Sequence, residues 1–165
     1  GSAATVGLMM THIIGYSNPQ AFEYAKSLGY AMQMTNFLRD IKEDYIERDR
    51  IYMPVQELKQ FNLTEEDITS QHMSDEFIAF MKFQLRRTEI LYTQADLGIP
   101  LLSWRGRVAV KLARNLYSAI DRKIEQQGYN VFSKRASTSL YEKICLVIYS
   151  LLPSWKNILS SLVPA

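Results

Sequence analysis

The spacing of apolar positions is helical over almost the whole chain. Between residues 22 and 38, apolar and small residues fall three and four positions apart and form one continuous stripe: Phe22, Ala25, Leu28, Gly29, Met32, Thr35 and Leu38. Such spacing is typical of a helix that buries one face. Short alternating runs of β-branched residues bounded by tight-turn pairs, the usual signal of strands, are absent from the sequence. The pattern therefore predicts an all-α protein.

Glycine and proline residues divide this pattern into about six helices, which we expect to form one domain over residues 1–165. After an apolar opening segment, one unbroken helix is expected from Pro19 to about Asp49. Thr64 and Asp67 have the spacing of a capping box at the start of another helix. The remaining expected helices are 55–60, the stretch from Ser74 to the interruption at Gly98, 107–127 closed by Gly128, and 141–152.

Composition and charge exclude several classes of function. A hydrophobic content of 47% in 165 residues is that of a globular protein. The net charge is only +2, so a nucleic-acid partner is not expected. The two histidines, His12 and His72, lie far apart and exclude a zinc centre. Cys145 is the single cysteine and cannot form an internal disulfide, so we expect a reducing, cytoplasmic location.

Residues 144–165 form a tail that carries one charge, on Lys156. Its length alone would permit a membrane-spanning helix, but Pro153 and Pro164 disfavour one. Two interpretations remain open. The tail is either an interfacial segment that makes peripheral membrane contact or a cover over the protein core.

One polar row carries the candidate chemistry. Residues four apart lie almost on the same face of a helix, so Asn36, Asp40 and Asp44 share one edge. Two more polar residues stand next to this row: Gln33 and Arg39. Two carboxylates and an amide oxygen form an all-oxygen array that suits Mg²⁺. The alternative is a solvated helix face with weak surface ion pairs, which the mixture of acids and bases in this segment also fits.

The same segment resembles a known motif. The run from Gln33 to Asp44, written Gln-x-x-Asn-x-x-Arg-Asp-x-x-Glu-Asp and followed by Arg50-Ile51-Tyr52-Met53-Pro54, resembles the second aspartate-rich motif of the squalene/phytoene synthase family. The small residues at 4–9 and the run Leu116-Tyr117-Ser118-Ala119-Ile120 agree with it in order. The later run Gly128-Tyr129-Asn130-Val131-Phe132 is most similar to the phytoene synthases of that family.

The resemblance implies a fold and a reaction. The fold would be an all-α, isoprenoid-synthase-like bundle around an apolar cavity. The reaction would be the head-to-head joining of two prenyl diphosphates, farnesyl or geranylgeranyl, with Mg²⁺ as cofactor. Composition does not distinguish these two substrates, nor does it show whether a nicotinamide-dependent reduction follows.

The resemblance also implies roles for individual residues. Asn36, Asp40 and Asp44 would hold Mg²⁺, and the two aspartates would take part in catalysis with Tyr117 at the reacting end of the substrate. Substrate contacts would come from Gln33, Arg39 and Arg50. The residues expected to wall a dry cavity are Met9, Met10, Met32, Phe37 and Tyr117.

The sequence departs from the family in one respect. Members carry two aspartate-rich motifs, and this chain has only the second. We therefore expect the C-terminal half of such an enzyme, inactive alone and in need of an N-terminal half or a partner chain. The alternative function is a non-catalytic helical module that keeps the fold for interaction or assembly.

Overall fold

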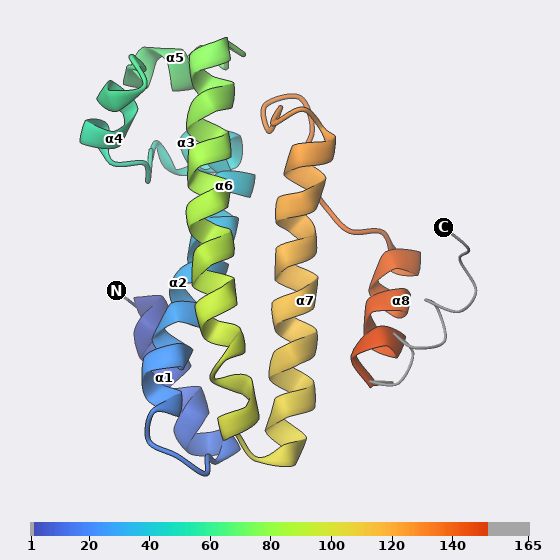
Figure 1. Ribbon diagram of the computed structural model, residues 1–165. Coiled ribbons are helices and arrows are strands. Elements are labelled where there is room, and N and C mark those ends of the chain that lie inside the picture. Colours follow the sequence, from blue (N-terminus) through green and yellow to red (C-terminus); the bar gives the residue numbers. More distant parts are fainter. Residues whose placement is uncertain (1, 152–165) are drawn as a thin grey trace, which may run out of the picture.

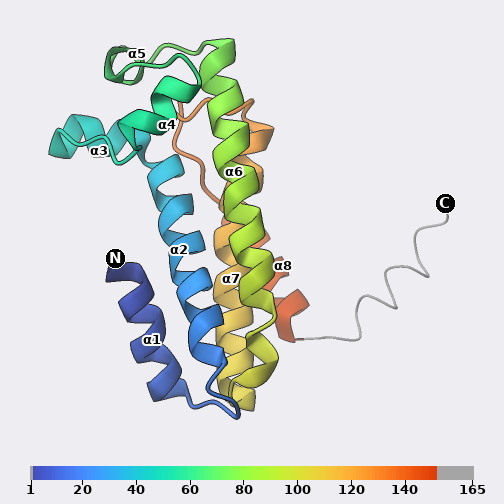
Figure 2. The same cartoon turned by 60° about the vertical axis from the view of Figure 1, so that its left-hand side comes forward.

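Three long helices form the frame of the molecule, which is described by a computed structural model over residues 2–151. Figures 1 and 2 show α2, α6 and α7 side by side and alternating in direction. α1 packs along α2, and α8 packs along α7. Their bounds are Ser2–Ile14 for α1, Ala21–Arg39 for α2, Asp75–Asp96 for α6, Trp104–Gln126 for α7 and Leu140–Leu151 for α8. The predicted helical architecture is confirmed.

Short elements join the long helices. They are α3 (Ile41–Arg48), α4 (Val55–Gln60), α5 (Glu65–Thr69) and the 3₁₀ turn η1 (Ile99–Leu101). The predicted capping box is present, because the Asp67 backbone N–H donates to the Thr64 hydroxyl and the Asp67 carboxylate accepts from the Thr64 N–H. Gly128 has a φ of +62° after the last turn of α7, as its position predicted.

The hydrophobic core lies at one end of the bundle. There, α3, α4, α5 and the segment after α7 fold over the ends of α2 and α6. The buried residues of this cluster include Leu38, Ile41, Leu58, Ile68, Phe77, Phe80, Ile124 and Phe132. The opposite end, where η1 joins α6 to α7, lies outside this cluster. The main hydrophobic core therefore lies at the same end of the bundle as the polar row.

The expected unbroken helix from Pro19 to Asp49 is wrong in one place. The backbone bends at Asp40, which has φ −104° and ψ 16°, so α2 ends at Arg39 and α3 leaves at an angle. The bend lets Ile41 join Leu38 in the core. Hydrogen bonding continues across it, from Asp40 N to Asn36 O at 2.9 Å and from Asp44 N to Asp40 O at 2.8 Å. Asn36, Asp40 and Asp44 thus keep the four-residue stacking that the sequence predicted.

α1 and α2 cross in unusually close contact, and two glycines permit it. A Cβ atom on Gly29 would collide with the backbone of Ala3, and one on Gly7 would lie 2.5 Å from the carbonyl oxygen of Ala25. These obstacles are backbone atoms, which cannot rotate away as the end of a side chain can. The glycines therefore set how closely α1 approaches α2.

Gly29→Ala is expected to destabilise the protein by about 1–3 kcal/mol, because the added methyl group forces the two helices apart. In an open helix the same change would stabilise instead, since alanine is the better helix former. Chemical denaturation followed by circular dichroism measures the difference. Ser27→Ala, two residues earlier on the same helix, is the control, and a Gly29→Ala protein at least as stable as this control would contradict the close crossing.

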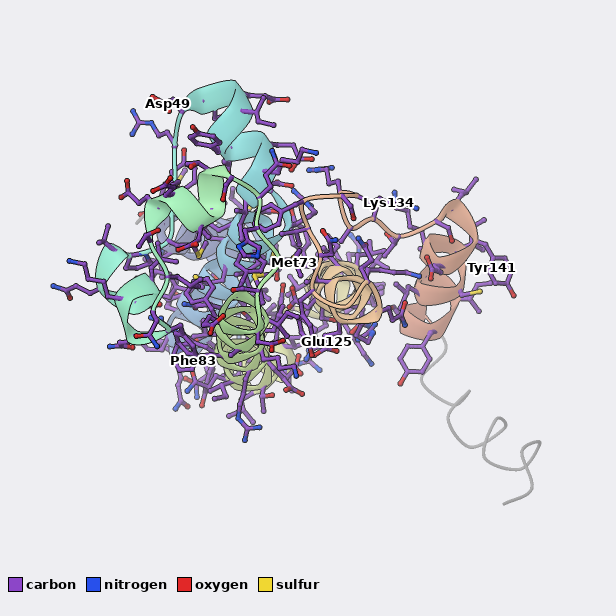
Figure 3. The ribbon with its side chains drawn as sticks, turned by 90° about the horizontal axis from the view of Figure 1, so that it is seen from above. Asp49, Met73, Phe83, Glu125, Lys134 and Tyr141 are labelled. Carbon is purple, nitrogen blue, oxygen red and sulfur yellow. The ribbon has the colours of Figure 1, made fainter. Side chains whose placement is uncertain are left out.

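α8 lies against α7, on the side away from α6 (Figure 3). Tyr141, near its start, points outward and is largely exposed. The predicted interfacial tail, 144–165, begins in this helix, and its part after residue 151 lies outside the described residues. Among the helices of residues 2–151, none is both long and apolar enough to cross a bilayer.

Candidate functional site

A polar pocket of about 550 Å³ opens between the bend at Asp40 and helix α7. Most of the predicted site residues meet here. The lining residues are Ser2, Gln33, Asn36, Phe37, Arg39, Asp40, Asp44, Arg48, Tyr52 and Tyr117. The four-residue spacing along α2 and α3 supplies the oxygen row, and Tyr117 approaches from α7.

Asp40 is held by two arginines. Arg39 donates to both carboxylate oxygens, with Nε–Oδ1 at 2.7 Å and Nη2–Oδ2 at 2.5 Å. Arg135, from the segment after α7, donates from Nε to Oδ1 at 2.8 Å. Burial by itself would raise the pKa of Asp40, but the hydrogen bonds from Arg39 and Arg135 outweigh it and hold the pKa below its usual value. Asp40 is therefore an anion at neutral pH.

Asp44 is the more deeply buried of the two aspartates. Its side chain is only 7% exposed, and Arg48 forms an ion pair with Oδ1 one helical turn later. Each carboxylate of the row thus has at least one guanidinium against it. The repulsion expected between two neighbouring carboxylates is relieved in this structure by arginines.

The donor set of the pocket fits a hard divalent cation. Two carboxylates and one amide oxygen are the kind of ligand that Mg²⁺ prefers, with water and phosphate oxygens completing its shell. Within residues 2–151, however, no three Asp, Glu, His or Cys side chains gather closely enough to hold a metal ion by themselves. These residues can supply part of a coordination shell, and only if the arginines give up some of the carboxylate oxygens.

An apolar pocket of about 570 Å³ adjoins the polar one. It runs between α1, α2 and α7 towards η1, and small residues such as Ala25, Gly29 and Ala113 make up much of its wall. Gln33, Asn36 and Tyr117 line both pockets. The two pockets therefore meet at these side chains and form one site with a polar end and an apolar end.

The structure brings together most of the predicted residues, but not all. Gln33, Asn36 and Arg39 lie with the two aspartates and Tyr117 in the polar pocket. Arg50 lines a neighbouring surface hollow with Arg48 and Tyr52. Among the expected cavity-wall residues, Met10 and Met32 line the apolar pocket and Phe37 the polar one, where it stacks on Tyr52 at 4.5 Å between ring centroids. Met9 lines neither pocket and is largely exposed.

Sequence reasoning missed Arg135 and Arg48. Arg135 lies 95 residues after Asp40, between the helices expected at 107–127 and 141–152, and no local spacing connects the two. Arg48 lies four residues after Asp44 in the sequence, which is the usual spacing of an ion pair within a helix. The sequence therefore contains this signal, and it is the kind of ion pair that the solvated-face alternative predicts.

A buried polar cluster ties α2, α6 and α7 together one turn away from the pocket. The Thr35 hydroxyl lies 2.9 Å from the hydroxyl oxygen of Tyr92 and donates to Asp121 Oδ2 at 3.2 Å. Burial raises the pKa of Asp121 to about 7, although the hydrogen bond from Thr35 opposes this. Thr35 precedes Asn36, and Asp121 follows Tyr117 by one turn, so the cluster fixes the spacing of α2 and α7 beside the site.

Removing Arg135 tests the ion pairs around Asp40. In Arg135→Ala the pKa of Asp40 is expected to rise, because the carboxylate loses one of the two donors that favour its charged form. A ¹³C NMR titration of labelled aspartate carboxyl groups measures this pKa. Arg87→Ala, which removes the partner of Glu57 on α4, is the control. An Asp40 midpoint that is equal in the wild-type and Arg135→Ala proteins would contradict the contact.

Comparison with known proteins identifies the family. Residues 1–142 match the family model described as squalene/phytoene synthase. The chain is 40% identical over 155 residues to 15-cis-phytoene synthase of Synechococcus elongatus, covering 87% of this chain and 50% of that protein. It is 38% identical over 148 residues to the chloroplastic phytoene synthase 1 of Arabidopsis thaliana, covering 86% of this chain and 35% of that protein.

Solved structures agree with the sequence comparison. A dehydrosqualene synthase crystallised with a ligand superposes with a TM-score of 0.81 at 28% identity, covering 96% of this chain and 54% of that one. A squalene synthase of Alicyclobacillus acidocaldarius gives a TM-score of 0.74 at 29% identity, covering 78% and 49%. The chain thus spans about half the length, or less, of these relatives. With this fold and this site, the chain belongs to the squalene/phytoene synthase family.

Proposed function

We propose that this chain, completed by the helices that its longer relatives carry, joins two prenyl diphosphates head to head in isoprenoid or carotenoid biosynthesis. The observation that carries the proposal is the meeting of a polar and an apolar pocket at Gln33, Asn36 and Tyr117. A prenyl diphosphate has the same two parts, a highly charged head and a long hydrocarbon chain. The substrate would lie with its head near Asp40 and its chain along α1 and α2.

The side chains of the polar pocket suit the departure of diphosphate. When the bond between the allylic carbon and oxygen breaks, its electron pair moves to the diphosphate, so negative charge grows at the polar end. Arg39 and Gln33 can donate hydrogen bonds to that charge. The apolar pocket keeps water from the allylic cation left behind, and the Tyr117 ring at the junction offers it an electron-rich face.

Mg²⁺ is proposed as the cofactor, in keeping with the divalent metal that prenyltransferases of this type generally use. Asn36, Asp40 and Asp44 would hold it, because they are the oxygen donors that line the pocket. Bound there, the ion would neutralise charge on the diphosphate and make it a better leaving group. Arg39, Arg48 and Arg135, released from the carboxylates, would then be available to the phosphate oxygens.

The chain is proposed to need a covering partner. The apolar pocket is walled on this chain by α1, α2, α6, α7 and η1, and the relatives are about twice as long or longer. An N-terminal half like that of the longer relatives, or a partner chain equivalent to it, would close the pocket and bring the first aspartate-rich motif to the Mg²⁺ site. Alone, the chain is expected to be inactive. A cytoplasmic location and peripheral membrane contact through the tail at 144–165 remain predictions.

The test uses the chain joined to an N-terminal half, incubated with farnesyl or geranylgeranyl diphosphate and Mg²⁺. Two diphosphates should be released for each condensed product, and the mass of that product tells the two substrates apart. A folded protein that releases no diphosphate would contradict the proposal and favour the alternative, a non-catalytic assembly module.

A further inference from the structure

The end of the bundle opposite the core exposes large apolar side chains. Ile13 at the end of α1 is 76% exposed, Leu97 after α6 is 61% exposed, and Trp104 at the start of α7 is 71% exposed. These chain segments come together at the lower end of the molecule in Figures 1 and 2. A tryptophan exposed to this degree beside aliphatic side chains is unusual on a surface that faces only water.

Two arginines lie next to Trp104 at this end. The Arg105 guanidinium lies 5.3 Å from the centre of the Trp104 ring, and Arg107 follows it on α7. In the described part of the chain neither arginine forms an ion pair with an acid. The nearby acid Asp96 is already paired with Arg114 at 2.8 Å. This end therefore combines exposed apolar groups with arginines that are not neutralised.

The apolar pocket reaches the same end. Its lining includes Ile14, which follows Ile13, and Leu102, which lies two residues before Trp104. Its other end meets the polar pocket at Asn36. The pocket thus connects the site of the aspartates with the surface around Trp104.

We propose that this surface, named here the Trp104 end and made up of Ile13, Leu97, Trp104, Arg105 and Arg107, docks on an anionic lipid bilayer. Tryptophan favours the boundary between lipid headgroups and hydrocarbon, and arginines are attracted to anionic headgroups. Docked in this way, the apolar pocket faces the membrane in which a long prenyl chain or a hydrocarbon product dissolves. That last consequence rests on the proposed function, whereas the docking itself does not.

Vesicle binding tests the docking with both the 165-residue chain and the longer protein. In the 165-residue chain with Trp155→Phe, tryptophan emission reports on Trp104 alone, and co-sedimentation with vesicles measures binding by the longer protein and by every variant. Vesicles of phosphatidylcholine with phosphatidylglycerol should shift this emission to the blue, and the binding should weaken as salt is added. Arg105→Glu should lower the affinity for these vesicles about thirty-fold, since it removes one positive charge and adds one negative. Trp104→Ser should also lower the affinity, even at high salt.

Matched variants elsewhere make the test specific. Arg86→Glu on α6 changes the charge equally at another exposed position, and Tyr141→Ser removes an exposed aromatic ring from α8. Both should bind as the parent protein does. Unchanged Trp104 emission, equal loss in Arg105→Glu and Arg86→Glu, or loss confined to Tyr141→Ser would each overturn the proposal. Binding by the chain but not by the longer protein would also overturn it, because the Trp104 end would then be covered. Diphosphate release from detergent-dispersed substrate tests the proposed function separately.

Discussion

Asp40→Ala is expected to lower the rate of diphosphate release by the proposed enzyme at least about a hundred-fold, while the protein stays folded. Asp40 is the anion on which Arg39 and Arg135 converge, and it is also a proposed Mg²⁺ ligand. Its loss removes charge from the centre of the polar pocket. Because its carboxylate lies outside the hydrophobic core, the loss should cost little folding free energy.

Steady-state release of diphosphate at saturating Mg²⁺ measures the effect, and Asp40→Asn separates the charge of the side chain from its size. Glu47→Ala is the control, because Glu47 is an exposed acid of α3 that does not line the polar pocket. If Asp40→Ala turns over as fast as Glu47→Ala, Asp40 takes no part in the reaction, and the role proposed for it in the polar pocket is wrong.

Asp121 is expected to make the protein less stable as the pH rises. In the folded state burial raises the pKa of Asp121 to about 7, from the ordinary value of 3.8. Between these two values the folded protein holds a proton that the unfolded chain has lost, so this contribution to stability is complete below pH 3.8 and disappears as the pH approaches 7. Its upper limit is about 4 kcal/mol.

Urea denaturation of the wild-type and Asp121→Asn proteins between pH 4 and 8 measures this contribution as the difference in pH dependence. Asparagine can still accept the hydrogen bond from Thr35 but cannot ionise, so the Asp121 component should vanish. Glu89→Gln, which neutralises an exposed acid of α6, should keep the wild-type dependence. If all three proteins show the same dependence on pH, Asp121 titrates as an ordinary surface carboxyl group.

Local rules were enough to predict the helical class and two of the helix ends. The Thr64–Asp67 box and the left-handed Gly128 depend on residues within three or four positions of each other, and both are present. The bend at Asp40 depends instead on the core that receives Ile41, which a periodic pattern does not describe. A continuous pattern of helical spacing therefore fits both a straight and a bent helix.

The residues of the candidate site also form two groups: those that local spacing predicts and those that only the packing of helices brings together. The row from Gln33 to Asp44 is local, and its residues lie together as its spacing predicted. Arg135 and the Thr35–Asp121 contact join positions that are 95 and 86 residues apart, so only the packing of α7 against α2 brings them together. Arg135, the second arginine against Asp40, was for this reason a part of the site that sequence reasoning could not supply.

The residues that line the apolar pocket are separate from those of the main core, and this has an evolutionary consequence. Residues such as Ala25, Ala109 and Ala113 border an empty volume and are not part of the main core. A larger side chain at these positions fills space without disturbing Phe77 or Phe80, which secure the fold. In the proposed enzyme, single replacements at these positions can therefore change the length of the pocket, and with it the length of prenyl chain preferred, without a loss of foldability.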